Sequence, residues 1–264
     1  MRNSTIPSKH PKLKKATAAV LTAAFWLGVW QLAAVLINEK IVLSPPLTVF
    51  ETLFRLAGTG TFWLTVAMSA LRIFCGFALG VVLGAALAVL TRVSRAAYTL
   101  FSPMMSVIKA TPVASFIIML LFFSENEYIP VVISFLMVFP IIWANTFKGI
   151  AETDEKLLEM AKVFGLSRRA TLREIYLPSV EPYFVPAALT SLGFAWKAGV
   201  AAEVLAAPKY AVGGMLYRAK IYLETPEMLA WTLCVIIISM LLEWLLSSLL
   251  RRSKAERSAA YDKA

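Results

Sequence analysis

One polar stretch separates the apolar blocks of this chain, and it reads Leu157-Leu158-Glu159-Met160-Ala161-Lys162-Val163-Phe164-Gly165, continuing through Ser167 to Ile175-Tyr176-Leu177-Pro178. The stretch predicts two short helices that meet at Gly165, because glycine tolerates the left-handed conformation with which helices often end. Ser167 is expected to cap the second helix, and Pro178 is expected to end it. A polar helical hairpin between apolar blocks indicates a docking element for a protein partner.

The chain around this hairpin has the composition of an integral membrane protein. Of its 264 residues, 59% are hydrophobic, and the mean hydropathy is +0.72. The apolar residues come in runs near or above the ~20 residues that cross a bilayer, whereas soluble proteins distribute them in stripes. These runs predict an all-α integral membrane protein of about six transmembrane helices, small enough for one membrane domain.

Six spans are expected, and they cover residues 16–37, 63–90, 113–123, 129–147, 182–202 and 228–250. The third run is too short to cross a bilayer and must extend back through Pro112 and Lys109. A proline and a charge in its inner half predict a bent or broken helix that faces protein or water. The expected organisation is a basic tail over 1–15, a membrane domain over 16–250 with the polar loop at 152–178, and a tail over 251–264.

Shorter sequence motifs lie within and between these spans. Ser44-Pro45-Pro46 predicts the start of a short amphipathic helix on the outer interface. Gly76, Gly80 and Gly84 fall four residues apart, a spacing that lets another helix approach closely. Gly213-Gly214 is expected to form a turn in an outer loop over residues 203–227.

The cationic residues predict the orientation of the chain. Segments expected inside hold 18 of the 26 Lys and Arg residues, and segments expected outside hold five. Because cytoplasmic loops carry the excess of Lys and Arg, both termini and the polar hairpin are predicted to be cytoplasmic. The net charge of +10 therefore reflects membrane orientation rather than nucleic-acid binding.

Several kinds of chemistry are excluded by residues that the sequence lacks. The single histidine, His10, lies in the N-terminal tail, which excludes a multi-histidine metal site within this chain. Cys75 and Cys234 both lie in apolar runs, where small core residues are expected rather than a disulfide framework. No G-x-x-x-x-G-K-[ST] loop is present to cradle phosphates. The chain is expected to be neither an enzyme nor a holder of cofactors.

The polar stretch resembles the EAA loop of ABC importer permeases, whose pattern is E-A-A-x3-G-x9-I-x-L-P. This sequence reads Glu159-x-Ala161-x3-Gly165-x9-Ile175-x-Leu177-Pro178, and departs from the pattern at Met160. The resemblance implies a type I importer permease in the bacterial cytoplasmic membrane. It also implies a homodimer with two cytoplasmic ATPase subunits, which hold the ATP and Mg²⁺, and an extracytoplasmic solute-binding protein.

The resemblance assigns ATPase coupling to this hairpin. The residues expected to take part are Leu157, Glu159, Ala161, Phe164, Gly165, Ile175, Leu177 and Pro178. Leu157, Ala161 and Phe164 form an apolar stripe that fits a groove on another protein. The alternative is a solvated surface helix that packs on its own membrane domain.

Residues 40–250 resemble the nitrate, sulfonate and taurine branch of these permeases. The matching segments are Ser44-Pro45-Pro46, Ser69-Ala70-Leu71-Arg72, Lys109-Ala110-Thr111-Pro112 and Ala201-Ala202-Glu203. Phe122-Phe123-Ser124 departs from the Phe-Gly pair that is common in this branch. The resemblance implies a small anionic nutrient as cargo. Related permeases carry thiamine precursors and other small nitrogen compounds, so that alternative stays open.

Ionisable residues within spans are candidates for the translocation path. They are Arg72, Lys109, Lys197 and Glu203. Two cations in the outer half, Arg72 and Lys197, would attract an anion. The alternative is pairing, of Glu203 with one of these cations and of Lys109 with Glu243.

Two other classes of protein are weighed against the importer. A self-sufficient secondary transporter would show internal repeats with paired broken helices, and no clear repeat relates the two halves. A membrane-embedded enzyme would need a convergent nucleophile or metal set, which the sequence does not offer.

Overall fold

The computed structural model describes residues 11–39 and 41–261, and every regular element in these ranges is helical. In chain order the elements are α1 (Pro11–Ile37), α2 (Pro46–Ala57), α3 (Gly60–Val93), α4 (Arg95–Ala110), α5 (Val113–Phe123), α6 (Ile129–Ala151), α7 (Glu155–Val163), α8 (Arg168–Thr171), the π-helix η1 (Leu172–Tyr176), α9 (Leu177–Ala206), α10 (Val212–Ile221) and α11 (Thr225–Tyr261). The all-α prediction is confirmed.

Five helices in the described ranges are long and apolar enough to cross a membrane, and a bent pair brings the number to six. The bent pair is α4 and α5, whose axes meet at 103°. The bend lies at Thr111 and Pro112, which have extended ψ angles of 128° and 135°. A proline disfavours the helical conformation of the residue before it, which explains the break at this point. The predicted bent or broken third span is therefore confirmed.

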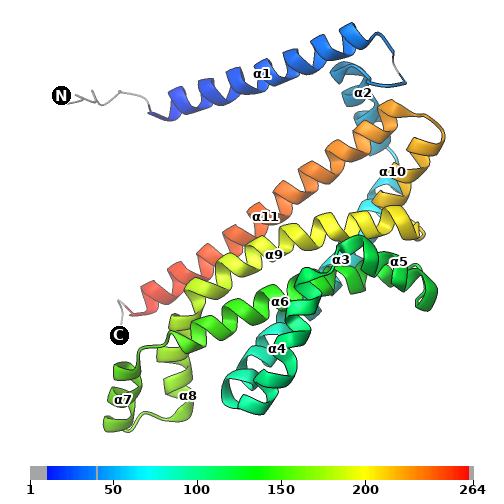
Figure 1. The fold of residues 1–264 in the computed structure, drawn as a ribbon. Coiled ribbons are helices and arrows are strands. Elements are labelled where there is room, and N and C mark those ends of the chain that lie inside the picture. The colour runs from blue at the N-terminus through cyan, green and yellow to red at the C-terminus, as the bar shows by residue number, and fades with distance from the viewer. Residues whose placement is uncertain (1–10, 40, 262–264) are drawn as a thin grey trace, which may run out of the picture.

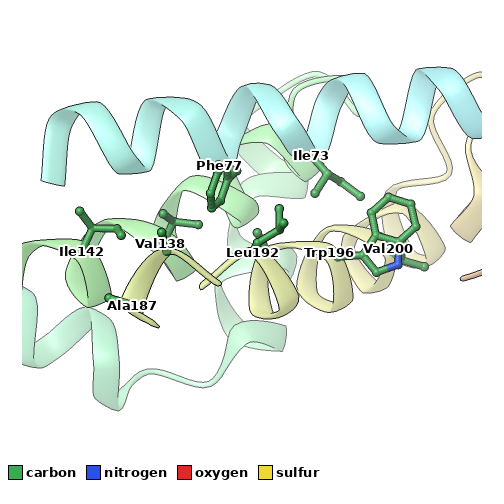
Figure 2. Close-up of a cluster of buried hydrophobic side chains, with 10 residues drawn as sticks. Ile73, Phe77, Val138, Ile142, Ala187, Leu192, Trp196 and Val200 are labelled. Carbon is green, nitrogen blue, oxygen red and sulfur yellow. The ribbon is translucent and has the colours of Figure 1, made fainter. Parts of the chain in front are cut away.

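The helices α3, α6 and α9 pack together and form the centre of the molecule (Figure 1). A buried cluster fills the space between them, with side chains from all three helices in contact (Figure 2). It includes Ile73, Phe77, Val138, Ile142, Ala187, Leu192, Trp196 and Val200. The glycine face of α3 lies against α6: a Cβ on Gly76 would come within 2.2 Å of the Val131 carbonyl oxygen.

Figure 1 shows two opposite ends of this helical body. The α7–α8 hairpin lies at the same end as the C-terminal part of α11, and α2 and α10 lie at the other end. Helix α1 extends away from the body and contacts mainly α2. The Trp30 indole N–H donates to the Ser44 carbonyl at 3.2 Å and anchors this junction. The largely exposed, apolar surface of α1 is suited to lipid.

The structure differs from the sequence predictions at several helix ends. Pro178 does not end a helix; it lies in the first turn of α9, and the chain is continuously helical from Arg168 to Ala206. The wide turn of η1 comes just before it and makes room for a residue without an N–H donor. Gly213 and Gly214 lie in the first turn of α10 rather than in a loop turn.

The proposed tails overlap with helices. Helix α1 begins at Pro11, so the last residues of the 1–15 segment are helical. Residues 1–10, and His10 with them, lie outside the described ranges. At the other end, α11 continues through the 251–264 segment as far as Tyr261.

Candidate functional site

The hairpin between α6 and α9 is closed by local hydrogen bonds. The Asp154 carboxylate caps α7 by accepting from the Lys156 N–H at 2.9 Å. At the other end of α7, Gly165 has a φ of +65°, as its sequence position predicts. The Gly165 N–H donates to the Lys162 carbonyl, and the Leu166 N–H donates to the Ala161 carbonyl. This pair of bonds is the Schellman motif, which satisfies carbonyls at the end of a helix.

The turn at Gly165 can be tested by substitution. A side chain at residue 165 would meet no neighbouring atoms, but the left-handed backbone conformation there disfavours any residue other than glycine or asparagine. Gly165→Val is expected to cost about 1–2 kcal/mol, since β-branched residues avoid the left-handed region. That energy raises the open population of the hairpin roughly 5- to 30-fold. The rate of tryptic cleavage at Arg168 in the purified protein should rise accordingly. Gly165→Asn is the control, because asparagine tolerates this conformation, and equal rates for both variants would contradict the prediction.

One face of α7 presents apolar side chains to the outside. The exposed fractions are 40% for Leu157, 46% for Met160 and 73% for Phe164. Ala161 is only 2% exposed, so the prediction that it belongs to this stripe is wrong. Its side chain is enclosed by the chain itself, and its carbonyl accepts from the Leu166 N–H in the Schellman turn. Glu159 is exposed on a different side of α7, because neighbouring residues of a helix do not share a face.

The second arm of the hairpin joins the membrane domain directly. Ser167 caps α8 as predicted, accepting from the Ala170 N–H at 3.2 Å. Ile175 is buried, whereas Leu177 and Pro178 are exposed at the start of α9. A cavity of about 890 Å³ lies between the hairpin, the start of α9 and the adjoining ends of α3 and α6. The hairpin is thus continuous with α9 and borders an open space between α3, α6 and α9.

A buried ionic network occupies the opposite end of the molecule. Arg72 on α3 is 7% exposed, and its guanidinium lies 3.8 Å from the carboxylate of the fully buried Glu203 on α9. Arg72 also pairs with Glu127 and donates to the carbonyls of Lys209 and Tyr210, at 2.7 and 3.1 Å. The network therefore joins α3, α9, the turn between α5 and α6, and the loop between α9 and α10.

Glu203 and Ser69 bind the first turn of α10. The Ser69 hydroxyl donates to the Glu203 carboxylate at 2.8 Å and accepts from the Val212 N–H at 2.9 Å. The Gly213 N–H donates to the same carboxylate at 3.1 Å. A negative charge at a helix N-terminus satisfies otherwise unpaired N–H groups. The network therefore fastens α10 and the loop before it to the membrane core.

The structure separates the four candidate path residues into different environments. The predicted alternative of an Arg72–Glu203 pair is confirmed, and both side chains are buried. Lys109 lies with its ammonium 5.9 Å from the centre of the Trp143 ring. The predicted pairing of Lys109 with Glu243 is wrong, because α4 packs on α6 while Glu243 faces α9.

Lys197 and Glu243 line one cavity of about 580 Å³ between α9 and α11. Sequence reasoning named Lys197 as a path residue but gave Glu243 a different partner. It also missed Ser69 and Glu127 in the outer network. Glu127 carried a signal, an acid in a tight turn, and only the folded chain shows that the turn lies beside Arg72.

A protein-family model and several known permeases match most of the chain. Residues 80–255 match the model for the binding-protein-dependent transport system inner membrane component. The taurine transport system permease protein TauC of Escherichia coli is 27% identical over 251 residues, which cover 92% of this chain and 91% of TauC. A putative aliphatic sulfonates transport permease protein, SsuC of Bacillus subtilis, is 27% identical over 80% of this chain and 77% of its own.

A bicarbonate transport system permease protein, CmpB of Synechococcus elongatus, is 26% identical over 61% of this chain and 58% of its own length. Among solved structures, the MetNI methionine ABC transporter in an inward facing form matches with a TM-score of 0.57 and 19% identity. That match covers 72% of this chain and 93% of the other, and it supports the fold. The chain belongs to the family of inner membrane components of binding-protein-dependent transport systems, and it is a multi-pass permease of an ATP-driven importer rather than an enzyme.

Proposed function

We propose that this permease carries a small anionic nutrient and is driven by separate ATPase subunits that dock on the α7–α8 hairpin. One observation carries the docking assignment: α7 exposes an apolar face at the end of a helical segment that continues into the membrane. Leu157, Met160 and Phe164 supply that face, and Glu159 is exposed on another side of the same helix. A short amphipathic helix of this kind binds in a groove on a partner.

The path from the hairpin into the membrane supports mechanical coupling. Helices α8, η1 and α9 form one continuous segment from Arg168 to Ala206. Movement of a docked partner would therefore be transmitted along α9 as a rigid-body displacement. The expected coupling residues are Leu157, Glu159, Phe164, Gly165, Ile175, Leu177 and Pro178, and Ala161 would support the turn from inside the hairpin. ATP and Mg²⁺ would bind the partner and not this chain.

The remaining partners follow from the family and from the shape of the molecule. The hairpin and the end of α11 lie at one end, which we assign to the cytoplasm, and α2 and α10 lie at the other end. That second end would face the solute-binding protein outside. A second copy of the chain would complete the path. Charged side chains on the surface of α9 and α11, such as Lys197, support this assembly, because lipid does not solvate them.

The cargo assignment rests on the relatives and on one residue. The matched permeases are named for taurine, aliphatic sulfonates and bicarbonate, which are small molecules with an acidic group. Lys197 is exposed in a cavity within the membrane and is about 13 Å from the outer end of α9 at 1.5 Å per residue. Arg72 is enclosed by its own partners and would hold the outer end together rather than contact cargo.

Phe164→Ala combined with Glu159→Lys is expected to abolish binding-protein-stimulated ATP hydrolysis by the reconstituted transporter. The double variant removes the large apolar contact and reverses an exposed charge on the same short helix. Truncation of a buried anchor costs 2 kcal/mol or more, which is roughly a 30-fold loss of ATPase affinity. Co-purification of the ATPase with the permease and the rate of phosphate release measure these effects.

Phe54→Ala is the matched control, because Phe54 on α2 is 75% exposed, like Phe164, but lies at the opposite end of the molecule. It should leave ATPase binding unchanged. Full ATPase retention and normal stimulation in the double variant would show that the hairpin is only a surface feature.

A further inference from the structure

The cavity between α9 and α11 presents opposite charges from its two walls. Lys197 projects from α9 and Glu243 from α11, and both line the same space of about 580 Å³. Both residues lie in helices that qualify as membrane spans. An ionisable group at membrane depth is costly unless it faces protein, water or a ligand. Two such groups in one cavity therefore need an explanation beyond packing.

Neither charge is neutralised inside the protein. Among the described residues, no ion pair or hydrogen bond joins Lys197 or Glu243 to another side chain, and both are exposed. Arg72 and Glu203, by contrast, are buried and share several partners in the outer network. The cavity thus contains one positively charged and one negatively charged side chain, and both are available to bind a ligand.

The other side chains that line the cavity limit the size and chemistry of that ligand. Thr190 and Ser247 add hydroxyl groups, and Phe194 and Trp244 add aromatic walls. The absence of a side chain at Gly193 leaves room for the Glu243 carboxylate, because a Cβ at this position would come within 2.9 Å of the Glu243 Oε1 atom. The carboxylate on α11 therefore lies directly against α9 at Gly193, which is about one helical turn from Lys197.

We propose that this cavity binds a small zwitterion, a molecule with an acidic group and an ammonium group on a short carbon chain. The Lys197 ammonium binds the acidic group, and the Glu243 carboxylate accepts from the ligand ammonium. A plain anion satisfies Lys197 but leaves Glu243 without a partner and repelled by the ligand charge. This inference rests on the proposed transport function and narrows its cargo from anions in general to amino-acid-like or aminosulfonate-like molecules.

The test compares ligands that differ only in the amino group. Taurine and ethanesulfonate form one matched pair, and β-alanine and propionate form the other. Binding of radiolabelled taurine to the permease–ATPase complex in nanodiscs is measured by scintillation proximity without the binding protein, with the other three as competitors. Hydrogen bonds to charged groups predict that each zwitterion competes roughly ten- to hundred-fold better than its amine-free partner.

Two variants assign the charges to the two ends of the ligand. Glu243→Gln should remove the preference for the amino group and strengthen ethanesulfonate binding, because the repulsion between the two negative charges is lost. Lys197→Met should weaken all four ligands. Glu224→Gln and Lys220→Met are the matched controls, because they remove the same charges from exposed positions outside the cavity, and both should behave as wild type.

The outcomes separate this inference from the proposed function. Equal competition by ethanesulfonate and taurine, absence of taurine binding, or unchanged selectivity in Glu243→Gln would overturn the zwitterion site. If either cavity variant fails to assemble with the ATPase while its control assembles, the charges hold subunits together and the site is refuted. ATPase binding and ATP hydrolysis of the wild-type complex are recorded in the same samples, and their absence would refute the transport function instead.

Discussion

Arg72→Ala is expected to destabilise the permease more than any other single charge removal at the end of the molecule that holds α2 and α10. The Oε1 atom of the buried Glu203 accepts no hydrogen bond in the wild-type protein, and the substitution also removes its ion pair with Arg72 at 3.8 Å. It also leaves the Lys209 and Tyr210 carbonyls without their guanidinium donor. Removing one partner of a buried ion pair costs about 3–5 kcal/mol, because the other charge stays buried without compensation.

The thermal unfolding of the purified protein, followed by the fraction that remains monodisperse, measures this effect. Arg55→Ala is the matched control, since Arg55 pairs with Glu227 at 3.5 Å but its side chain is 71% exposed. Exposed pairs contribute about 0–1 kcal/mol. An Arg72→Ala protein no less stable than Arg55→Ala would mean that the network does not hold this end of the molecule together.

Gly76→Ala is expected to prevent close packing of the two central helices, although it adds a single methyl group. The new Cβ would lie 2.2 Å from the Val131 carbonyl oxygen, a backbone atom that cannot rotate away. Helices α3 and α6 must then move apart, which opens the contacts around the buried cluster. Overpacking of this kind costs about 3 kcal/mol, and we expect loss of most folded protein from the membrane.

A graded series tests the cause of this loss. Gly84→Ala brings its Cβ to 2.9 Å from the Phe139 carbonyl oxygen and should have a smaller effect. Gly28→Ala meets nothing within 4 Å and should be neutral or slightly stabilising. Fluorescence of folded, detergent-solubilised fusion protein ranks the variants, and the same loss in all of them would exclude close helix contact as the reason.

Much of this protein is encoded in local patterns that need no folded neighbour. Apolar runs of membrane-crossing length are visible in the sequence, and so are the break before Pro112 and the glycine face of α3. The hairpin is equally local: Gly165 and Ser167 form the cap and turn that their residue types predict. The position of Pro178 inside a continuous helix is not predictable from the sequence, because residue types do not indicate the π-helical turn that precedes it.

Tertiary structure decides whether each charged residue is buried in an ion pair or exposed in a cavity. Sequence spacing gives their depth along a helix but not the direction in which they face or the helix that lies opposite. Arg72 and Glu203 are more than a hundred residues apart and meet because α3 and α9 pack side by side. Lys197 and Glu243 share a cavity because α9 and α11 cross at that level.

The sequence by itself determined that the chain spans a membrane, that a polar hairpin interrupts it, and which residues shape that hairpin. Those features depend on hydrophobic run length and on backbone preferences within a few residues, and both are local. Only the tertiary structure decided which ionisable residues are enclosed and which are free. Helix packing brings distant side chains within reach of one another, and electrostatic energy depends on those distances and on burial.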